Sequence, residues 1–286
     1  MIYLQLLING ILLGGIYGLM SIGLNLVWGV VGIVNFAHGE FLMIAMYATF
    51  WLVTLMHIDP YLGLLLIAPS FFLLGYILEK ILIQPIIKAP HVSQIFVTLG
   101  MGIILENLAL IFWKADTRAL YLSYTSASLQ WGPLIIGITR LLAWVISAGI
   151  TGLLFLFLKK TYQGKAVQAV AQNLTGARAV GVNINFTYAL AFALGTVCVA
   201  IAGATLMVIY PTYPTIGSNF VLIAFVVVVL GGLGNLSGTI IGGLIIGIIE
   251  AFAGFYFPGP ITMAIYFSIF IIILIFRPSG LFAKRA

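Results

Sequence analysis

Charged side chains and cysteine are both scarce in this sequence of 286 residues. Only 6% of the residues are Asp, Glu, Lys or Arg, and Cys198 is the single cysteine, so no disulfide can form within the chain. Hydrophobic residues make up 63% of the chain and the mean hydropathy is +1.23, far above the values of soluble domains. The composition predicts a polytopic integral membrane protein with one transmembrane domain, residues 1–286, and no soluble catalytic domain.

Several catalytic motifs are also missing from the sequence. It contains no GxxxxGK[ST] phosphate-binding loop, so the chain is not expected to bind ATP itself. Neither HExxH nor GxSxG occurs, and the His38-Gly39-Glu40 triplet lacks the second ligand that metal chemistry would need. The sequence therefore predicts no enzyme, no metal site and no cofactor.

Apolar runs recur along the whole chain, and most are near the roughly 20 residues that cross a bilayer as a helix. They predict an all-α transmembrane bundle of about 8–10 hydrophobic segments. The runs lie at 4–30, 36–57, 61–83, 93–113, 139–158, 186–210, 217–233, 236–257 and 260–276.

The basic residues are unevenly shared between the two sides of this bundle. If the segments alternate, three of the twelve Lys and Arg, namely Lys114, Arg118 and Arg140, fall on one side. The other nine are Lys80, Lys88, Lys159, Lys160, Lys165, Arg178, Arg277, Lys284 and Arg285. Cytoplasmic loops are enriched in Lys and Arg, which predicts an N-terminus outside and a C-terminus in the cytoplasm. The net charge of +6 follows from this bias and does not indicate nucleic-acid binding.

Two polar, glycine-rich breaks interrupt the apolar pattern. The first contains Asn35, His38, Gly39 and Glu40, and the second contains Gly231, Gly232, Gly234 and Asn235. Polar groups at membrane depth must be satisfied by protein or by water in a pathway. Paired interruptions in two halves of a chain are typical of transporters with internal repeats. We expect both breaks to be half-helices or re-entrant elements that line or gate a substrate pathway.

We interpret Glu40, Glu106 and Glu250 as intramembrane carboxylates, at a depth where a charge costs roughly 3 kcal/mol. Glu40 follows a helix start, so it either caps the broken helix or takes part in substrate passage. Glu106, with Asn107 beside it, and Glu250 are expected to make hydrogen bonds between helices. GxxxG steps at Gly10, Gly14 and Gly18, at Gly234, Gly238 and Gly242, and at Gly243 and Gly247 predict close helix packing.

The longest cytoplasmic linker, residues 159–185, has the pattern of a short amphipathic helix. Lys165, Gln168, Gln172 and Thr175 fall on one face, and Val167, Val170, Ala171 and Leu174 fall on another. Gly176 is expected to end this helix, and Ala177 to Val180 to form one further turn. Such a helix can anchor to lipid or dock a partner; with Val and Leu as its only bulky apolar residues, a partner is favoured.

Three segments together give the chain a family resemblance over nearly its full length. GIVNFAHGEF, GKAVQAVAQNLTGARAVGVNI and VVLGGLGNLSGTIIGGLIIGIIEAF resemble the permease subunits of ABC importers for branched-chain amino acids, the leucine/isoleucine/valine group. The wider superfamily includes permeases for ribose-type sugars, nucleosides and urea or short amides. The NFAHGE form favours the amino-acid and urea/amide branches.

This resemblance implies a permease in the cell membrane that moves an amino acid inward by alternating access. It implies an extracytoplasmic solute-binding protein, a second, homologous permease subunit and two cytoplasmic ATPase subunits that bind the ATP. It also assigns ATPase coupling to residues of the 159–185 loop: Gly164, Lys165, Ala171, Gln172, Ala177 and Gly181. Gln172 and Asn173 replace a Glu-Asp pair that is common in the family, so no salt bridge to the ATPase is expected there.

Two alternatives remain open from the sequence. A urea or short-amide permease of the same superfamily would share the breaks and the loop. An ion-coupled secondary transporter would also explain buried carboxylates and broken helices, but it gives no reason for the 159–185 helix and predicts uptake without an ATPase.

Overall fold

The computed structural model describes residues 1–125, 127–132, 134–257, 259–277 and 280–282. Lys284 and Arg285 of the charge count lie outside the described residues. The helices are α1 (Ile2–Val31), α2 (His38–Met56), α3 (Pro60–Leu78), α4 (His91–Trp113), α5 (Ile138–Lys160), α6 (Tyr162–Gln172), α7 (Leu174–Ala179), α8 (Ile184–Leu206), α9 (Ile216–Gly231), α10 (Leu236–Tyr256) and α11 (Gly259–Phe276). A π-helical turn (Glu79–Ile83) and a 3-10 turn (Gln84–Ile86) extend α3.

Seven stretches of the described chain are long and apolar enough to cross a membrane: α1, α2, α3 with its extension to Ile86, α4, α5, α8 and α10. The two shorter apolar helices are α9 and the 261–276 part of α11. These nine segments coincide with the nine apolar runs of the sequence. The prediction of a polytopic helical bundle is therefore confirmed.

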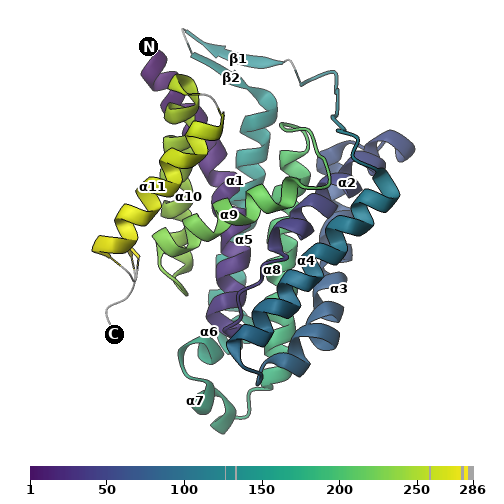
Figure 1. Ribbon diagram of the computed structural model, residues 1–286, viewed down its shortest axis with the longest axis vertical. Helices are drawn as coiled ribbons and strands as arrows, with labels where there is room; N and C mark the ends of the chain where they lie inside the picture. Colours follow the sequence, from purple (N-terminus) through teal and green to yellow (C-terminus); the bar gives the residue numbers. More distant parts are fainter. Residues whose placement is uncertain (126, 133, 258, 278–279, 283–286) are drawn as a thin grey trace.

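A β-hairpin in the connection between α4 and α5 corrects the all-α prediction. Strand β1 (Ser128–Trp131) pairs antiparallel with β2 (Leu134–Gly137). Residues 114–137 lie outside the apolar runs, where water can satisfy the open edges of a two-stranded sheet. Figure 1 shows the hairpin and the N-terminus at one end of the molecule, and α6 and α7 at the opposite end.

Helix α1 lies at the centre and packs against α10, α8 and α5. Glycine on both helices lets α1 and α10 approach closely: a Cβ on Gly14 would lie 2.7 Å from Leu244 Cα, and one on Gly243 would lie 2.6 Å from Gly18 Cα. The predicted close packing through GxxxG steps is confirmed for this pair. Helix α8 is almost wholly buried, whereas α3, α4 and α5 expose apolar faces of the kind that lipid covers.

Candidate functional site

The first break doubles back along α1. Gly32, with a φ of 76°, ends α1, and α2 begins at His38. His38 Nε2 donates to the carbonyl oxygen of Met20 at 2.9 Å, and Met20 lies eleven residues before the last residue of α1. At 1.5 Å per residue, residues 32–37 therefore climb about 16 Å along α1. Helix α2 therefore begins beside the middle of the apolar span of α1, and the re-entrant character of this break stays a prediction.

Polar groups along this extended segment are satisfied by neighbouring protein atoms. Asn35 Oδ1 accepts from the Ala37 backbone N–H at 3.1 Å, and Thr98 of α4 donates to the Val34 carbonyl oxygen at 3.1 Å. Asn35 and His38 are each 1% exposed. Asn35 thus accepts the hydrogen bond of Ala37, the residue before α2, and both alternatives for Glu40 stay predictions.

Glu40 lies where the first turns of α2 and α9 meet. A Cβ on Gly217, in the first turn of α9, would lie 2.6 Å from Glu40 Cδ, and a Cβ on Gly39 would lie 2.7 Å from Gly217 C. Glu40 is 5% exposed, and its Oε2 has no hydrogen-bond partner within the described ranges. The N-terminal ends of two helices, with their partial positive charge, therefore flank one buried carboxyl group.

The second break is held by an α1 residue that sequence reasoning missed. Asn25 is fully buried; its Nδ2 donates to Thr239 Oγ1 at 2.6 Å and to the Gly232 carbonyl oxygen at 3.3 Å, and its Oδ1 accepts from Gly234 N at 2.7 Å. Asn235 caps α10 by accepting from Gly238 N at 3.1 Å. The available signal was the position of Asn25 deep inside the first apolar run, since a buried amide needs several hydrogen-bond partners.

The two breaks lie at opposite ends of α9. Glu40 of the first break meets Gly217 at the start of α9, whereas the second break follows the end of α9 at Gly231. Gly217 was not predicted as a site residue; the polar Ser218 and Asn219 beside it, at the start of an apolar run, were its only signal. An internal repeat stays a prediction.

The second break opens instead on a groove of about 580 Å³ that it shares with α6. Leu233 to Ser237 form one wall, and Val167, Gln168, Ala171 and Gln172 of α6 form another. Asn25 and Gly29 of α1 line the groove as well. A displacement of α6 would therefore reach the second break directly.

The amphipathic segment is divided differently from the prediction. Asn173, which accepts from Gly176 N at 2.8 Å, separates α6 from α7, so Gly176 lies inside a helix and does not end one. Asparagine competes for backbone hydrogen bonds and favours a cap over a helix interior. Val167 and Val170 are buried against the bundle, which contacts α6 through α1, α5 and α8. The apolar Val face is therefore unavailable for lipid anchoring.

The six predicted coupling residues fall into two groups. Lys165, Ala171, Gln172 and Gly181 are exposed at this end of the molecule. Gly164 and Ala177 are buried, which corrects the expectation that they face a partner. Gly164 lets α6 turn back on α5, because a Cβ there would lie 2.5 Å from Leu158 Cα.

The remaining intramembrane polar residues have separate roles. Tyr17 of α1 donates to Glu250 Oε1 of α10 at 3.0 Å, which confirms the predicted bond between helices. Asn107 Nδ2 donates to the Ile103 carbonyl oxygen of its own helix at 2.8 Å, and the interhelical bond of Glu106 stays a prediction. Glu79, also missed, is fully buried in the π-helical turn, and its oxygens lack partners among the described residues. Among the residues that the structure describes, no group of three or more His, Cys, Asp or Glu side chains could hold a metal ion.

Comparison with known proteins decides the family. Residues 6–275 match the family described as branched-chain amino acid transport system / permease component. The chain belongs to this permease family. As a member, the permease is a multi-pass transmembrane subunit of an ABC transport system and carries out no catalysis itself.

Relatives of the permease match along nearly its whole length. It is 30% identical to the high-affinity branched-chain amino acid transport system permease protein BraD of Pseudomonas aeruginosa, and 31% identical to LivH of Escherichia coli. Each match covers 99% of this chain and 96% of the relative. A probable branched-chain amino acid transport permease protein LivH of Methanocaldococcus jannaschii is 27% identical over 88% of this chain and 81% of its own. No solved structure matches the chain. Membership of an ABC transport system implies ATPase and binding-protein partners.

Proposed function

We propose that the permease imports branched-chain amino acids, which it receives from an extracytoplasmic solute-binding protein and moves inward by alternating access. The observation that carries this proposal is the meeting of the interrupted helices α2 and α9 at buried Glu40, in a chain of the branched-chain amino acid permease family. Broken helices whose N-terminal ends point at a mid-membrane site are a common design for binding small charged substrates.

The proposed orientation places α6 and α7 in the cytoplasm and the hairpin outside. The described basic residues Lys159, Lys160, Lys165 and Arg178 cluster on or beside α6 and α7, whereas Arg118 and Arg140 belong to the connection and helix start at the hairpin end. The positive-inside rule supports this arrangement. A single transmembrane permease domain, 1–286, would then carry a cytoplasmic coupling loop, 159–185.

The coupling loop would bind one of two cytoplasmic ATPase subunits, and a second permease subunit would complete the membrane assembly. The exposed residues Lys165, Ala171, Gln172 and Gly181 supply the contact surface in this proposal. The groove between α6 and the second break supplies the path by which ATPase movement would reach Asn25, Gly232 and Gly234. Gly231 and Asn235, which flank the second break, would move with it.

Reconstituted uptake tests the proposal. The permease is placed in vesicles with its partner permease, the ATPases and the binding protein, and uptake of labelled leucine is measured with and without ATP. We expect uptake to require ATP and to resist an excess of urea. Leucine uptake that persists without ATP would instead support a secondary transporter, and competition by urea would support the amide branch.

A further inference from the structure

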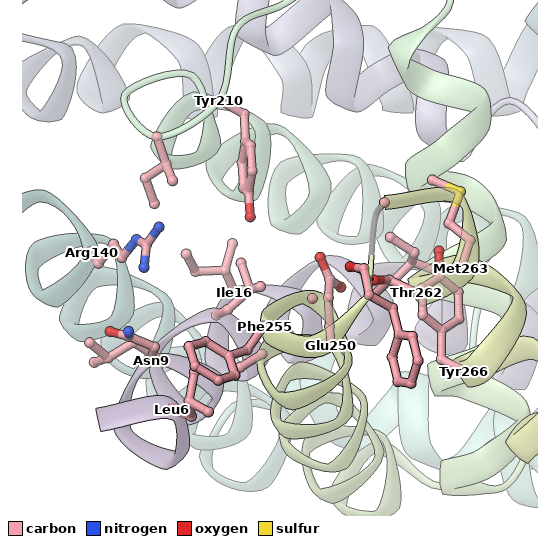
Figure 2. A pocket seen from close by; sticks show the side chains of 18 residues that line it. Leu6, Asn9, Ile16, Arg140, Tyr210, Glu250, Phe255, Thr262, Met263 and Tyr266 are labelled. Atoms are coloured by element: carbon pink, nitrogen blue, oxygen red, sulfur yellow. Dashed lines mark hydrogen bonds between the residues drawn. The ribbon is translucent and has the colours of Figure 1, made fainter. Parts of the chain in front are cut away.

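A second candidate binding site lies away from Glu40, at the hairpin end of the bundle. An open cavity of about 740 Å³ is lined by α1, the start of α5, the connection after α8, α9, and the facing ends of α10 and α11. Figure 2 shows its lining side chains. The volume falls within the roughly 300–1,000 Å³ range of small-molecule sites. In the proposed orientation this cavity is on the side from which substrate arrives.

The cavity carries one positive and one negative side chain from different helices. Arg140, in the first turn of α5, and Glu250, in α10, extend into it from opposite sides, with the Tyr210 hydroxyl directed between them (Figure 2). Glu250 Oε1 accepts from Tyr17, but Glu250 Oε2 is buried without a partner in the part of the chain that the structure describes. A buried carboxylate oxygen left unpaired is costly, so it favours a cationic ligand group.

The remaining walls are apolar and suit a branched aliphatic side chain. Leu12 and Ile16 of α1, Ile223 of α9 and Phe255 of α10 supply most of this surface. A ligand of matching chemistry would present an anionic group to Arg140, a cationic group to Glu250 and an aliphatic group to these walls. Arg binds carboxylate oxygens with paired, charge-assisted hydrogen bonds.

We infer that this cavity binds a zwitterionic branched amino acid, with its α-carboxylate at Arg140 and its α-ammonium at Glu250, before it passes to the Glu40 site. The substrate class rests on the proposed function; the place and the two ion contacts rest on the cavity. Aromatic rings separate the two sites: Phe220 of α9 packs on Tyr17 and on Tyr210 with ring centroids 6.4 Å apart in each pair. Phe220 lies one turn beyond Gly217, which contacts Glu40, so entry to the inner site requires these rings to move.

Ligand discrimination tests the two assigned contacts. The assembled transporter is held in nanodiscs without ATP or binding protein and titrated with leucine, with leucinamide, which lacks the carboxylate, and with isocaproate, which lacks the ammonium group. Wild type is expected to prefer leucine over both by about tenfold or more, as one charge-assisted contact provides. Glu250→Gln should lose only the preference for leucine over isocaproate. Arg140→Gln should lose only the preference for leucine over leucinamide.

Two control variants separate this assignment from damage to the fold. Lys114→Gln and Asp116→Asn each remove one charge outside the cavity. Both should retain the wild-type order of ligands. If both Arg140→Gln and Glu250→Gln kept the wild-type ligand preferences, the cavity site would be wrong, whereas ATP-driven leucine uptake would still support the proposed function. If the wild-type transporter showed no ATP-driven leucine uptake, the proposed function itself would be wrong.

Discussion

At the scale of single residues, a few buried polar side chains hold the irregular backbone of the two breaks. Asn25 satisfies an N–H and a carbonyl group of the second break, and His38 ties the start of α2 to Met20. Unpaired backbone groups at membrane depth cost several kcal/mol, so these contacts are what allow helices to end inside the bundle. Glu40 differs from Asn25 and His38, because one of its oxygens is left without a partner among the described residues.

Replacement of Asn25 should destabilise the permease. Asn25→Leu would leave Gly234 N without its partner, and the Gly232 carbonyl oxygen and the Thr239 hydroxyl would each keep only their bond to Asn235, at a cost of about 1–3 kcal/mol in the free energy of unfolding. Thermal unfolding in nanodiscs measures the effect. Asn107→Leu is the matched control, since that amide bonds only within its own helix and is exposed; equal stability of the two variants would contradict the assigned role.

At the scale of elements, helix α9 is shorter than a full membrane span. It has 16 residues and is about 24 Å long, against the roughly 30 Å of the hydrocarbon core. Both of its ends, Ile216 and Gly231, are buried, and its first turn meets that of α2 (Figure 1). Outside the spans, single side chains attach the long connections to the helices.

One such attachment is insensitive to pH over the physiological range. Tyr124 of the connection after α4 donates to Asp59 Oδ2 at 2.6 Å, while Asp59 Oδ1 caps α3. Burial and the bond to Asp59 raise the pKa of Tyr124 above its ordinary value of about 10. A pKa raised on folding means that the stabilisation is complete below pH 10 and is lost only as the pH rises through the folded-state value.

Hydrogen exchange of the Thr125 amide checks this contact. Tyr124→Phe should speed exchange by a factor that stays the same from about pH 6 to about pH 9, because the tyrosine is neutral throughout. Tyr121→Phe, at a side chain that is 93% exposed, should have no effect. If the effect of Tyr124→Phe on the exchange rate became smaller between those pH values, the hydrogen bond would be lost below the raised pKa of Tyr124, and this prediction would be contradicted.

At the scale of the whole molecule, the account joins a cytoplasmic contact surface to the second break through α6. Because Ala171 is exposed and lines the groove beside that break, Ala171→Trp should block ATPase docking or the transmitted movement. We expect binding-protein-stimulated ATP hydrolysis to fall to the unstimulated rate with the bundle still folded. Leu129→Trp, an equally exposed change in the hairpin, serves as the control, and normal stimulation in Ala171→Trp would contradict the coupling path.

The overall bundle was predictable from sequence because membrane spans are defined by length and apolarity alone. The nine segments and the GxxxG contact between α1 and α10 follow from such local patterns. Contacts between distant residues do not: nothing in the sequence pairs Asn25 with Gly234, or Glu40 with Gly217. The hairpin and the break at Asn173 were mispredicted because short aqueous segments depend on single hydrogen bonds that periodicity does not show.

The central claim is that substrate passes Glu40 where α2 and α9 meet. Its most direct test is the rate of ATP-driven leucine uptake by Glu40→Gln, with ATP hydrolysis measured in the same vesicles and Asp116→Asn, an exposed carboxylate outside the spans, as the control. Loss of a charged contact worth about 1.5–3 kcal/mol should lower uptake roughly 10-fold to 100-fold. We predict that loss in Glu40→Gln with ATP hydrolysis retained, and normal uptake in Asp116→Asn. Wild-type uptake by Glu40→Gln would contradict the account.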